Sequence, residues 1–317
     1  MKSKFVQTFA AAVFSASLGL AQPHCVSPMG VDIKSGAQAK PVAMQPTAAP
    51  TAVIRLLVRG DDLGSCHVAN VAAIAAHHAG ILRSVEVMVP GPWFLEAADL
   101  LAENPDLDVG VHLTLTSEWD HLKWRPLTHA PSLVDADGYF FSNVDERGKP
   151  GSGLLGAPRP GEIENELRAQ IEMARRHIKR ISHLSTHMFA PDAAPELNAI
   201  LSKLAHEYKL SLELDGLMII PSLGEWPKAT GEQKENAMID HLEHIGPGVW
   251  FFLAHPGDND PEMLAMYAKP WYPNVAFDRE GDCRVLLSPR VREVIARRGI
   301  ELVSYADVLR ERGRTLP

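Results

Sequence analysis

The sequence predicts an α/β fold in which parallel strands and helices alternate, in a (β/α) barrel that is incomplete or distorted. Short apolar runs alternate with stretches of helical periodicity from about residue 53 to the end of the 317-residue chain. Such alternation requires right-handed crossovers between parallel strands, which leaves a doubly wound sheet or a barrel. Seven or eight strands over roughly 265 residues favour the barrel. The polar residues with catalytic potential also follow apolar runs directly, as they do in barrel enzymes.

The expected strands are short apolar segments bounded by polar or turn-forming residues. In chain order they are Val53–Val58, Ser84–Val89, Asp108–Leu113, His183–Thr186, Ser211–Leu214, Val249–Ala254 and Glu301–Val303. Two of the helices between them show apolar residues at helical spacing. These stripes are Ile163, Leu167, Ile171, Ala174 and Ile178 in the first helix, and Leu197, Ile200, Leu201 and Leu204 in the second.

Two long aromatic-rich insertions, Glu118–Pro160 and Asp258–Cys283, interrupt the alternation after strands that bear motifs. Loops at the carboxyl ends of barrel strands build binding sites, so these aromatic side chains could wall a substrate cleft. The alternative is that they pack the loops onto the barrel, and for most of them we expect this simpler role.

The N-terminal segment differs in character from the rest of the chain. Lys2 and Lys4 precede an uncharged apolar run, Phe9–Leu20, which is the layout of a cleaved secretory signal at residues 1–21. Residues 22–52, rich in Pro, Ala, Gln and Ser, read as a flexible linker, and residues 53–317 form the barrel. We therefore expect a secreted or periplasmic bacterial protein with no stable membrane insertion after cleavage.

Composition excludes several other classes of function. A hydrophobic content of 46% is that of a globular protein with a substantial core, and the net charge of −8 makes nucleic acid an improbable partner. Cys66 and Cys283 are the only cysteines of the barrel, so no zinc-type cysteine pairing exists, and a disulfide between them is left open. The oligomeric state, including a homo-oligomer, is left open too.

Four motifs point to one shared site. They are Asp61-Asp62, His112, His187 and the histidine of His255-Pro256-Gly257, each at or just beyond an apolar run. Separately, each has a bland reading as a turn, a helix cap or a buried histidine. Together they suggest more, because an Asp and two His can hold one divalent cation while a second Asp acts as a base. A metal-dependent hydrolase is the leading hypothesis.

These motifs, with several others in the same order, resemble the YdjC-like carbohydrate deacetylases, which include diacetylchitooligosaccharide and hopanoid-related N-deacetylases. The resemblance spans nearly all of the barrel. It covers Arg59–Gly64, Val109–Thr116, Arg125-Pro126-Leu127, Ser132–Gly138, Glu166–Ile171, His183–His187, His255-Pro256-Gly257 and Ser304–Val308.

The resemblance implies a distorted TIM-like barrel with one divalent metal ion, Mg²⁺ or Zn²⁺, held by Asp62, His112 and His187. It implies that Asp61 is the general base that takes a proton from the attacking water. It implies that His255 is the acid that protonates the departing amine, and that the substrate is an N-acetylated amino sugar or oligosaccharide. Three protein ligands would leave room at the metal for water and for an acetyl oxygen.

The chain departs from the family pattern beside the site. The family usually reads His-x-Asp-Ser-His-x-His where this chain has Ser185 before His187 and Phe189 after it. We expect the missing acid to have supported His187, and the missing histidine to have touched substrate. Arg59-Gly60 also stands where Asn-Ala is usual. The family's sugar preference is therefore not carried over to this chain.

Two further hypotheses remain open at this stage. One is a metal-dependent hydrolase of another amide or ester, because the chemistry does not fix what carries the acyl group. The other is a carbohydrate-binding barrel without catalysis. The presence of both a base candidate, Asp61, and an acid candidate, His255, counts against the latter.

Overall fold

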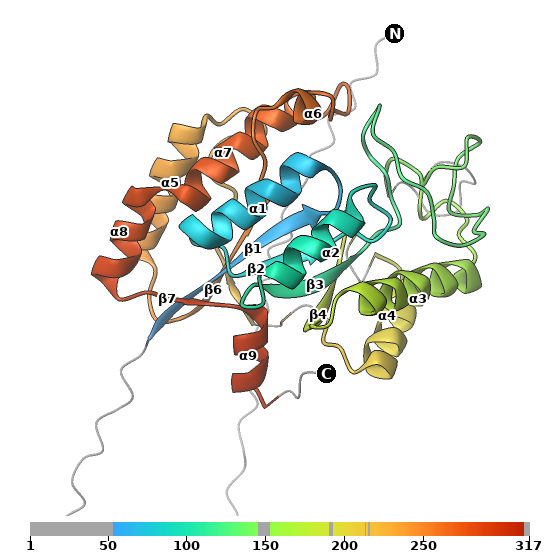
Figure 1. Ribbon diagram of the computed structural model, residues 1–317, viewed down its shortest axis with the longest axis horizontal. Helices are drawn as coiled ribbons and strands as arrows, with labels where there is room; N and C mark the ends of the chain where they lie inside the picture. The colour runs from blue at the N-terminus through green and yellow to red at the C-terminus, as the bar shows by residue number, and fades with distance from the viewer. Residues whose placement is uncertain (1–52, 145–152, 190–192, 213, 215, 314–317) are drawn as a thin grey trace, which may run out of the picture. The chain divides into compact units, whose positions relative to one another are not determined.

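The computed structural model describes residues 53–144, 153–189, 193–212, 214 and 216–313. The expected signal segment, 1–21, and the whole of the expected linker, 22–52, lie outside this part of the chain. The predicted fold class is confirmed: the chain forms a parallel sheet curved into a distorted, open TIM-like barrel with helices packed around it (Figure 1).

The sheet has seven strands in the order β4-β3-β2-β1-β6-β5, with β7 also pairing with β1, and every pairing is parallel. The strands are β1 (Ile54–Leu63), β2 (Ser84–Val87), β3 (Asp108–Leu113), β4 (His183–Thr186), β5 (Met218–Ile219), β6 (Gly248–Ala254) and β7 (Glu301–Val303). No described strand joins β4 to β5, so over the described residues the barrel stays open between these two edges.

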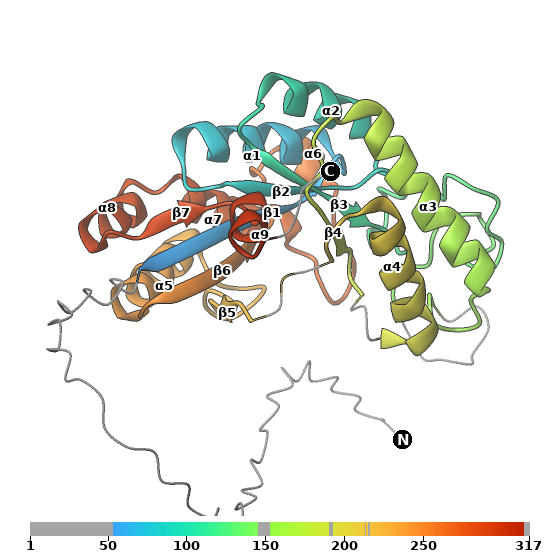
Figure 2. The ribbon, with the colours of Figure 1, turned by 90° about the horizontal axis from the view of Figure 1, so that it is seen from below.

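Nine helices are described, and Figure 2 shows them around the outside of the curved sheet. They are α1 (His67–Ala79), α2 (Phe94–Glu103), α3 (Pro160–His177), α4 (Pro195–Tyr208), α5 (Gly231–His244), α6 (Pro261–Leu264), α7 (Val275–Leu287), α8 (Pro289–Arg298) and α9 (Tyr305–Glu311). Both predicted apolar stripes, on α3 and α4, are buried in the main hydrophobic cluster. Burial of such a stripe is the main reason that an amphipathic helix is stable.

Strand β1 lies in the middle of the sheet and determines the position of the site. Its residues Leu56, Leu57 and Val58 are fully buried, as expected of a central parallel strand covered on both faces. The pairing of β1 with β2 is regular to Gly60 and shifts register before Leu63, and Asp62 has a φ of 70°. Neighbouring residues of a regular strand point to opposite faces. This irregularity lets both aspartates of Asp61-Asp62 reach the same pocket.

Three predicted boundaries were wrong. Strand β1 continues to Leu63, so the paired aspartates lie within the strand and not beyond it. Of the predicted strand Ser211–Leu214, the described residues show a single parallel bridge, between Ser211 and His183, and Leu212 and Leu214 pack against two different hydrophobic clusters. The fifth strand is instead β5. The second predicted insertion also contains α6 and the first turns of α7.

The open question about the cysteines has a clear answer. Cys66 and Cys283 are both buried and free. The Cys66 sulfur accepts a hydrogen bond from the Ala69 amide and so caps the N-terminus of α1. Among the described residues, no helix is long and apolar enough to cross a membrane.

Candidate metal centre and its pocket

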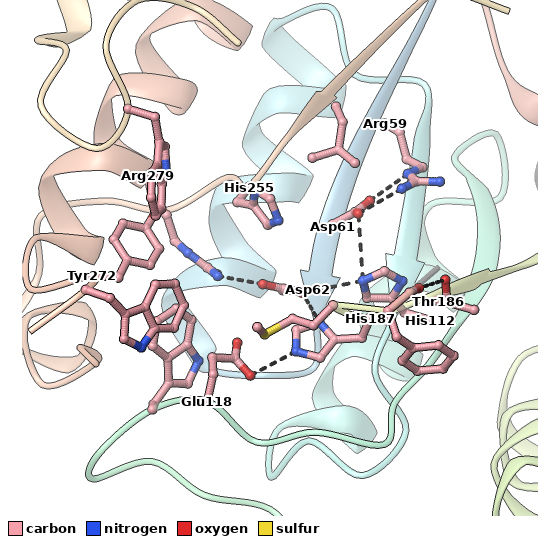
Figure 3. Close-up of a pocket in the computed structure, with 16 residues that line it drawn as sticks. Arg59, Asp61, Asp62, His112, Glu118, Thr186, His187, His255, Tyr272 and Arg279 are labelled. Carbon is pink, nitrogen blue, oxygen red and sulfur yellow. Dashed lines mark hydrogen bonds and ion pairs between the residues drawn. The ribbon is translucent and has the colours of Figure 1, made fainter. Parts of the chain in front are cut away.

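The motif residues predicted to share a site all line one cavity of about 580 Å³ at the carboxyl ends of the strands (Figure 3). They are Asp61, Asp62, His112, His187 and His255. The site is therefore brought together from β1, β3 and the residues that follow β4 and β6. The cavity is also lined by Arg59, noted in the sequence only as a departure from the family pattern, and by residues that the sequence did not point to, which include Glu118, Trp226 and Arg279.

Asp62, His112 and His187 form the centre of the cavity. One ligand atom from each lies within 4.8 Å of the others, and all three side chains are buried. Asp62 Oδ1 lies 3.2 Å from His187 Nδ1 and 3.7 Å from His112 Nε2, and it accepts no hydrogen bond from any described residue. A buried carboxylate oxygen without a donor is costly. Two imidazoles and one carboxylate facing that oxygen are the donor set of a divalent metal site, so the residues fit the implied ion.

Arg279 of α7 holds the other oxygen of Asp62. Its Nη2 donates to Asp62 Oδ2 at 2.5 Å, and both side chains are almost fully buried. Burial alone would raise the pKa of Asp62, but Arg279 and then His187 hold that pKa well below its usual range. Asp62 is therefore an ionised carboxylate whose orientation is fixed from one side.

His112 is held from behind by a chain of hydrogen bonds. Its Nδ1 lies 2.7 Å from Ser185 Oγ, and the Ser185 hydroxyl donates to the Glu86 carboxylate, which also contacts His183. Burial lowers the pKa of His112 to about 4, so the ring is neutral at physiological pH. Burial would raise the pKa of Glu86, but His183 and Arg59 bring it down to about 2.

His187 has a different partner. Its Nε2 lies 3.0 Å from Glu118 Oε2, and its ring packs edge-on against Trp124. Burial alone would lower the pKa of His187, but Glu118 and Asp62 raise it to about 10. Ser185, which stands where the family has the acid, hydrogen-bonds with His112, so His187 takes its support from another residue. Ser185 pairs with His112 across β3 and β4, and its hydroxyl contacts the His112 ring. Glu118, from the first insertion, contacts His187.

Asp61 lies beside this centre and forms an ion pair with Arg59. The guanidinium donates from Nε and Nη2 to the two carboxylate oxygens of Asp61 at 2.7 and 2.9 Å. Arg59 also donates to the Tyr305 hydroxyl at 3.3 Å. Asp61 Oδ2 is 3.7 Å from His112 Nε2. The Arg59 departure from the family pattern thus places a cation directly on the candidate base, and the fork keeps that carboxylate in one orientation.

His255 enters the cavity from the end of β6, and Figure 3 shows its ring and Asp61 close to Asp62. Its backbone amide donates to Asp282 Oδ2 at 2.8 Å, and Asp282 is paired with the buried Lys234 at 2.7 Å. This network fixes the backbone of His255 and leaves its ring at the cavity wall.

Aromatic side chains form one wall of the cavity. Trp226, Trp271 and Tyr272 lie together, with centroid distances of 4.8 Å for Trp226–Tyr272 and 5.6 Å for Trp271–Tyr272. Trp226 and Trp271 are about half exposed, whereas Trp124 and Phe140 of the first insertion are buried. Of the aromatic residues in the two insertions, Trp271 and Tyr272 line the cavity, whereas Trp124 and Phe140 pack in the core. Trp226 could not be found because its loop belongs to neither insertion.

Comparison with known proteins agrees with this architecture. The YdjC-like protein family model matches residues 55–297. A carbohydrate deacetylase of Thermus thermophilus is 33% identical over 76% of this chain and 89% of its own length. A chitooligosaccharide deacetylase of Yersinia pestis is 29% identical over 80% of this chain and 98% of its own length. A solved structure from Enterococcus faecalis V583, of a protein named for cellobiose-phosphate cleavage, superposes with a TM-score of 0.66 at 23% identity. It covers 81% of this chain and 99% of the other, and shows the same fold. The predicted resemblance is confirmed: the chain belongs to the YdjC-like family.

Proposed function

We propose that this protein is a metal-dependent hydrolase that removes the N-acetyl group from an amino sugar or an N-acetylated oligosaccharide. One observation supports this most directly. A buried Asp-His-His cluster, in which Asp62 Oδ1 faces both imidazoles and accepts no hydrogen bond, lies next to an ionic Asp61–Arg59 pair, inside a cavity walled by aromatic rings. Two relatives that share this family are named as deacetylases of carbohydrates.

Asp62, His112 and His187 would hold the divalent ion, which when bound polarises a carbonyl oxygen and makes water more acidic. His112 offers Nε2 in a neutral ring, and Asp62 offers the oxygen that Arg279 leaves unused. His187 offers Nδ1, while Glu118 holds the opposite nitrogen of its ring. Hydrogen bonds from such supporting groups fix the orientation of ligand side chains.

Asp61 is the proposed general base. It lines the cavity beside the ligand Asp62, and Arg59 holds it by two hydrogen bonds. A carboxylate in a fixed orientation within the cavity can accept the proton of a water that attacks the amide carbon.

His255 is the proposed general acid. An amine is a poor leaving group unless it is protonated as the C–N bond breaks. The His255 ring lines the same cavity as Asp61 and Asp62, and its backbone is fixed by Asp282. Water attack and amine departure would then each have a separate proton carrier, Asp61 for the water and His255 for the amine.

The aromatic wall favours a sugar as the carrier of the acetyl group. Trp226 and Trp271 present half-exposed rings at the cavity, where the apolar face of a pyranose can pack. The basic and apolar N-terminal segment supports a secreted or periplasmic location, which would bring the enzyme to sugars outside the cytoplasm. Export of an intact chain bearing a reporter would test that location.

The decisive experiment measures acetate release from a panel of N-acetylated sugars and oligosaccharides, with the protein metal-stripped and then reconstituted with Zn²⁺ or Mg²⁺. Asp62→Ala, His112→Ala and His187→Ala are expected to lose bound metal and activity together while remaining folded. His206→Ala, an exposed histidine of α4, is the matched control and should behave as wild type. Full metal occupancy and turnover in any of the three would remove that residue from the ligand set. Acetate release that continues after complete metal removal would contradict the proposal.

A further inference from the structure

The carboxylate of Glu86 lies at the centre of a buried polar network behind the candidate metal centre. Glu86 is fully buried on β2, a strand that contributes no residue to the cavity wall. One of its oxygens lies 2.5 Å from His183 Nε2, and the other accepts the Ser185 hydroxyl proton. A buried carboxylate is costly unless its hydrogen bonds are satisfied, so its presence here needs a reason.

The strand register explains how Glu86 reaches this position. Glu86, Gly110 and His183 are direct neighbours across β2, β3 and β4. His112 and Ser185 form the next row on the same face, because side chains of a strand alternate with a period of two. Glu86 therefore extends across Gly110 to meet both side chains of β4.

Gly110 keeps that path open. A Cβ atom at position 110 would lie 2.6 Å from His183 Nε2 and 2.7 Å from Glu86 Oε1, distances that real Cβ atoms do not show. The absence of a side chain in the middle strand is therefore a condition for the Glu86–His183–Ser185 contacts. The network is built into the sheet at three adjacent strands.

The direction of the hydrogen bonds follows from simple counting. Ser185 has one hydroxyl proton, and it donates that proton to Glu86. Its oxygen can then only accept from His112 Nδ1, which lies 2.7 Å away. His112 is thereby fixed as the Nδ1–H tautomer, and the lone pair of Nε2 faces Asp62, 3.7 Å from Oδ1.

We infer that Glu86 is a positioning residue that acts through Ser185 to fix the tautomer and ring orientation of His112 for metal binding. This inference rests on the proposed function, in which His112 is a ligand. A carboxylate commonly takes this role for a metal-ligating histidine. Here Glu86 does not contact His112 directly: the Ser185 hydroxyl lies between them and makes one hydrogen bond to each. The competing explanation is that Glu86 only neutralises and anchors His183.

The test compares two buried serines of the same strand region. Ser185→Ala breaks the link from Glu86 to His112, whereas Ser182→Ala removes a hydroxyl that contacts His183 Nδ1 and leaves the link intact. We expect Ser185→Ala to weaken Zn²⁺ binding by about 10–100-fold in a chelator competition assay. Ser182→Ala should bind Zn²⁺ as wild type does.

A second readout uses the metal-free protein. Nitrogen-15 NMR of the histidine rings, with His112→Asn used for assignment, should show the Nδ1–H tautomer in wild type and Ser182→Ala. Ser185→Ala and Glu86→Gln should shift His112 towards a mixture of tautomers. This measurement does not depend on metal binding. It therefore tests the Glu86–Ser185–His112 hydrogen bonds even if the proposed metal-dependent function is wrong.

A double variant provides rescue. In Glu86→Gln/Ser185→Asp, the new carboxylate would contact His112 directly and the new amide could donate to it. Zn²⁺ affinity and the tautomer should return close to wild type, although Glu86→Gln alone is impaired. An unchanged tautomer and affinity in Ser185→Ala would overturn the inference. So would equal losses in Ser182→Ala, because these would assign the network to His183 instead.

Discussion

Replacement of Arg279 by Met should destabilise the metal-stripped protein strongly. Arg279 and Asp62 are 2% and 3% exposed, and Arg279 donates to Asp62 Oδ2 at 2.5 Å. Removing one partner of a buried ion pair leaves an uncompensated charge and typically costs about 3–5 kcal/mol. For a domain of this size, each kcal/mol lowers Tm by about 2–4 °C, so the expected drop is roughly 6–20 °C.

Arg284→Met is the matched control, because it changes the same residue type on the same helix. Arg284 is about half exposed, and its partner Glu235 keeps a hydrogen bond from Ser288 and an ion pair with Arg290. An exposed pair contributes about 0–1 kcal/mol, so Tm should hardly change. Differential scanning calorimetry of both variants, with and without Zn²⁺, is the assay. Zn²⁺ should raise the Tm of Arg279→Met more than that of wild type, because it supplies the cation that Asp62 has lost. Equal Tm drops in the two variants would refute this reasoning.

Three further outcomes are expected. Asp61→Asn should keep its metal, measured by elemental analysis, and lose roughly 10²–10⁴ in kcat, since an amide cannot take the proton; a parallel loss of metal would make Asp61 a ligand. His255→Ala should slow hydrolysis of an N-acetyl sugar far more than that of an activated aryl acetate, and equal losses would instead assign His255 to carbonyl binding. Metal binding should displace a proton from His187, whose pKa is raised to about 10. Raising the pH towards that value removes this competition, so apparent affinity should increase by about tenfold per unit between pH 7 and pH 9. Calorimetry in buffers of different ionisation enthalpy would count the proton, and a pH-independent affinity would contradict the assignment.

The sequence was sufficient to predict the features that depend on periodicity and on strand ends. The stripes of α3 and α4 are buried as predicted, and Asp62, His112 and His187 meet as predicted. These succeeded because parallel strands bring their carboxyl ends to one edge of the sheet. The ligand roles themselves remain predictions until a metal is measured.

The supporting groups could not be predicted, because each depends on a contact between distant segments. Arg279 is one arginine of a helix with no motif around it, and it reaches Asp62 across 217 positions of sequence. Glu118 appeared only as the first residue of an insertion. Glu86 is a polar residue within an apolar strand, and that anomaly was a usable signal. The contact of Ser185 with His112 was not predicted, because strand register, and not sequence adjacency to His187, decides its neighbour.

The position of both aspartates on β1 affects how the site changes when the sheet moves. Asp61 and Asp62 are neighbours on one central strand, so covalent geometry limits how far the candidate base and the candidate ligand can separate. His112 and His187 belong to β3 and to the end of β4, towards the open edge of the sheet. Fluctuations of that edge would therefore move the candidate ligands His112 and His187 away from Asp62, while Asp61 and Asp62 move together. On warming, we expect the hold on metal to weaken before the alignment of the base is lost.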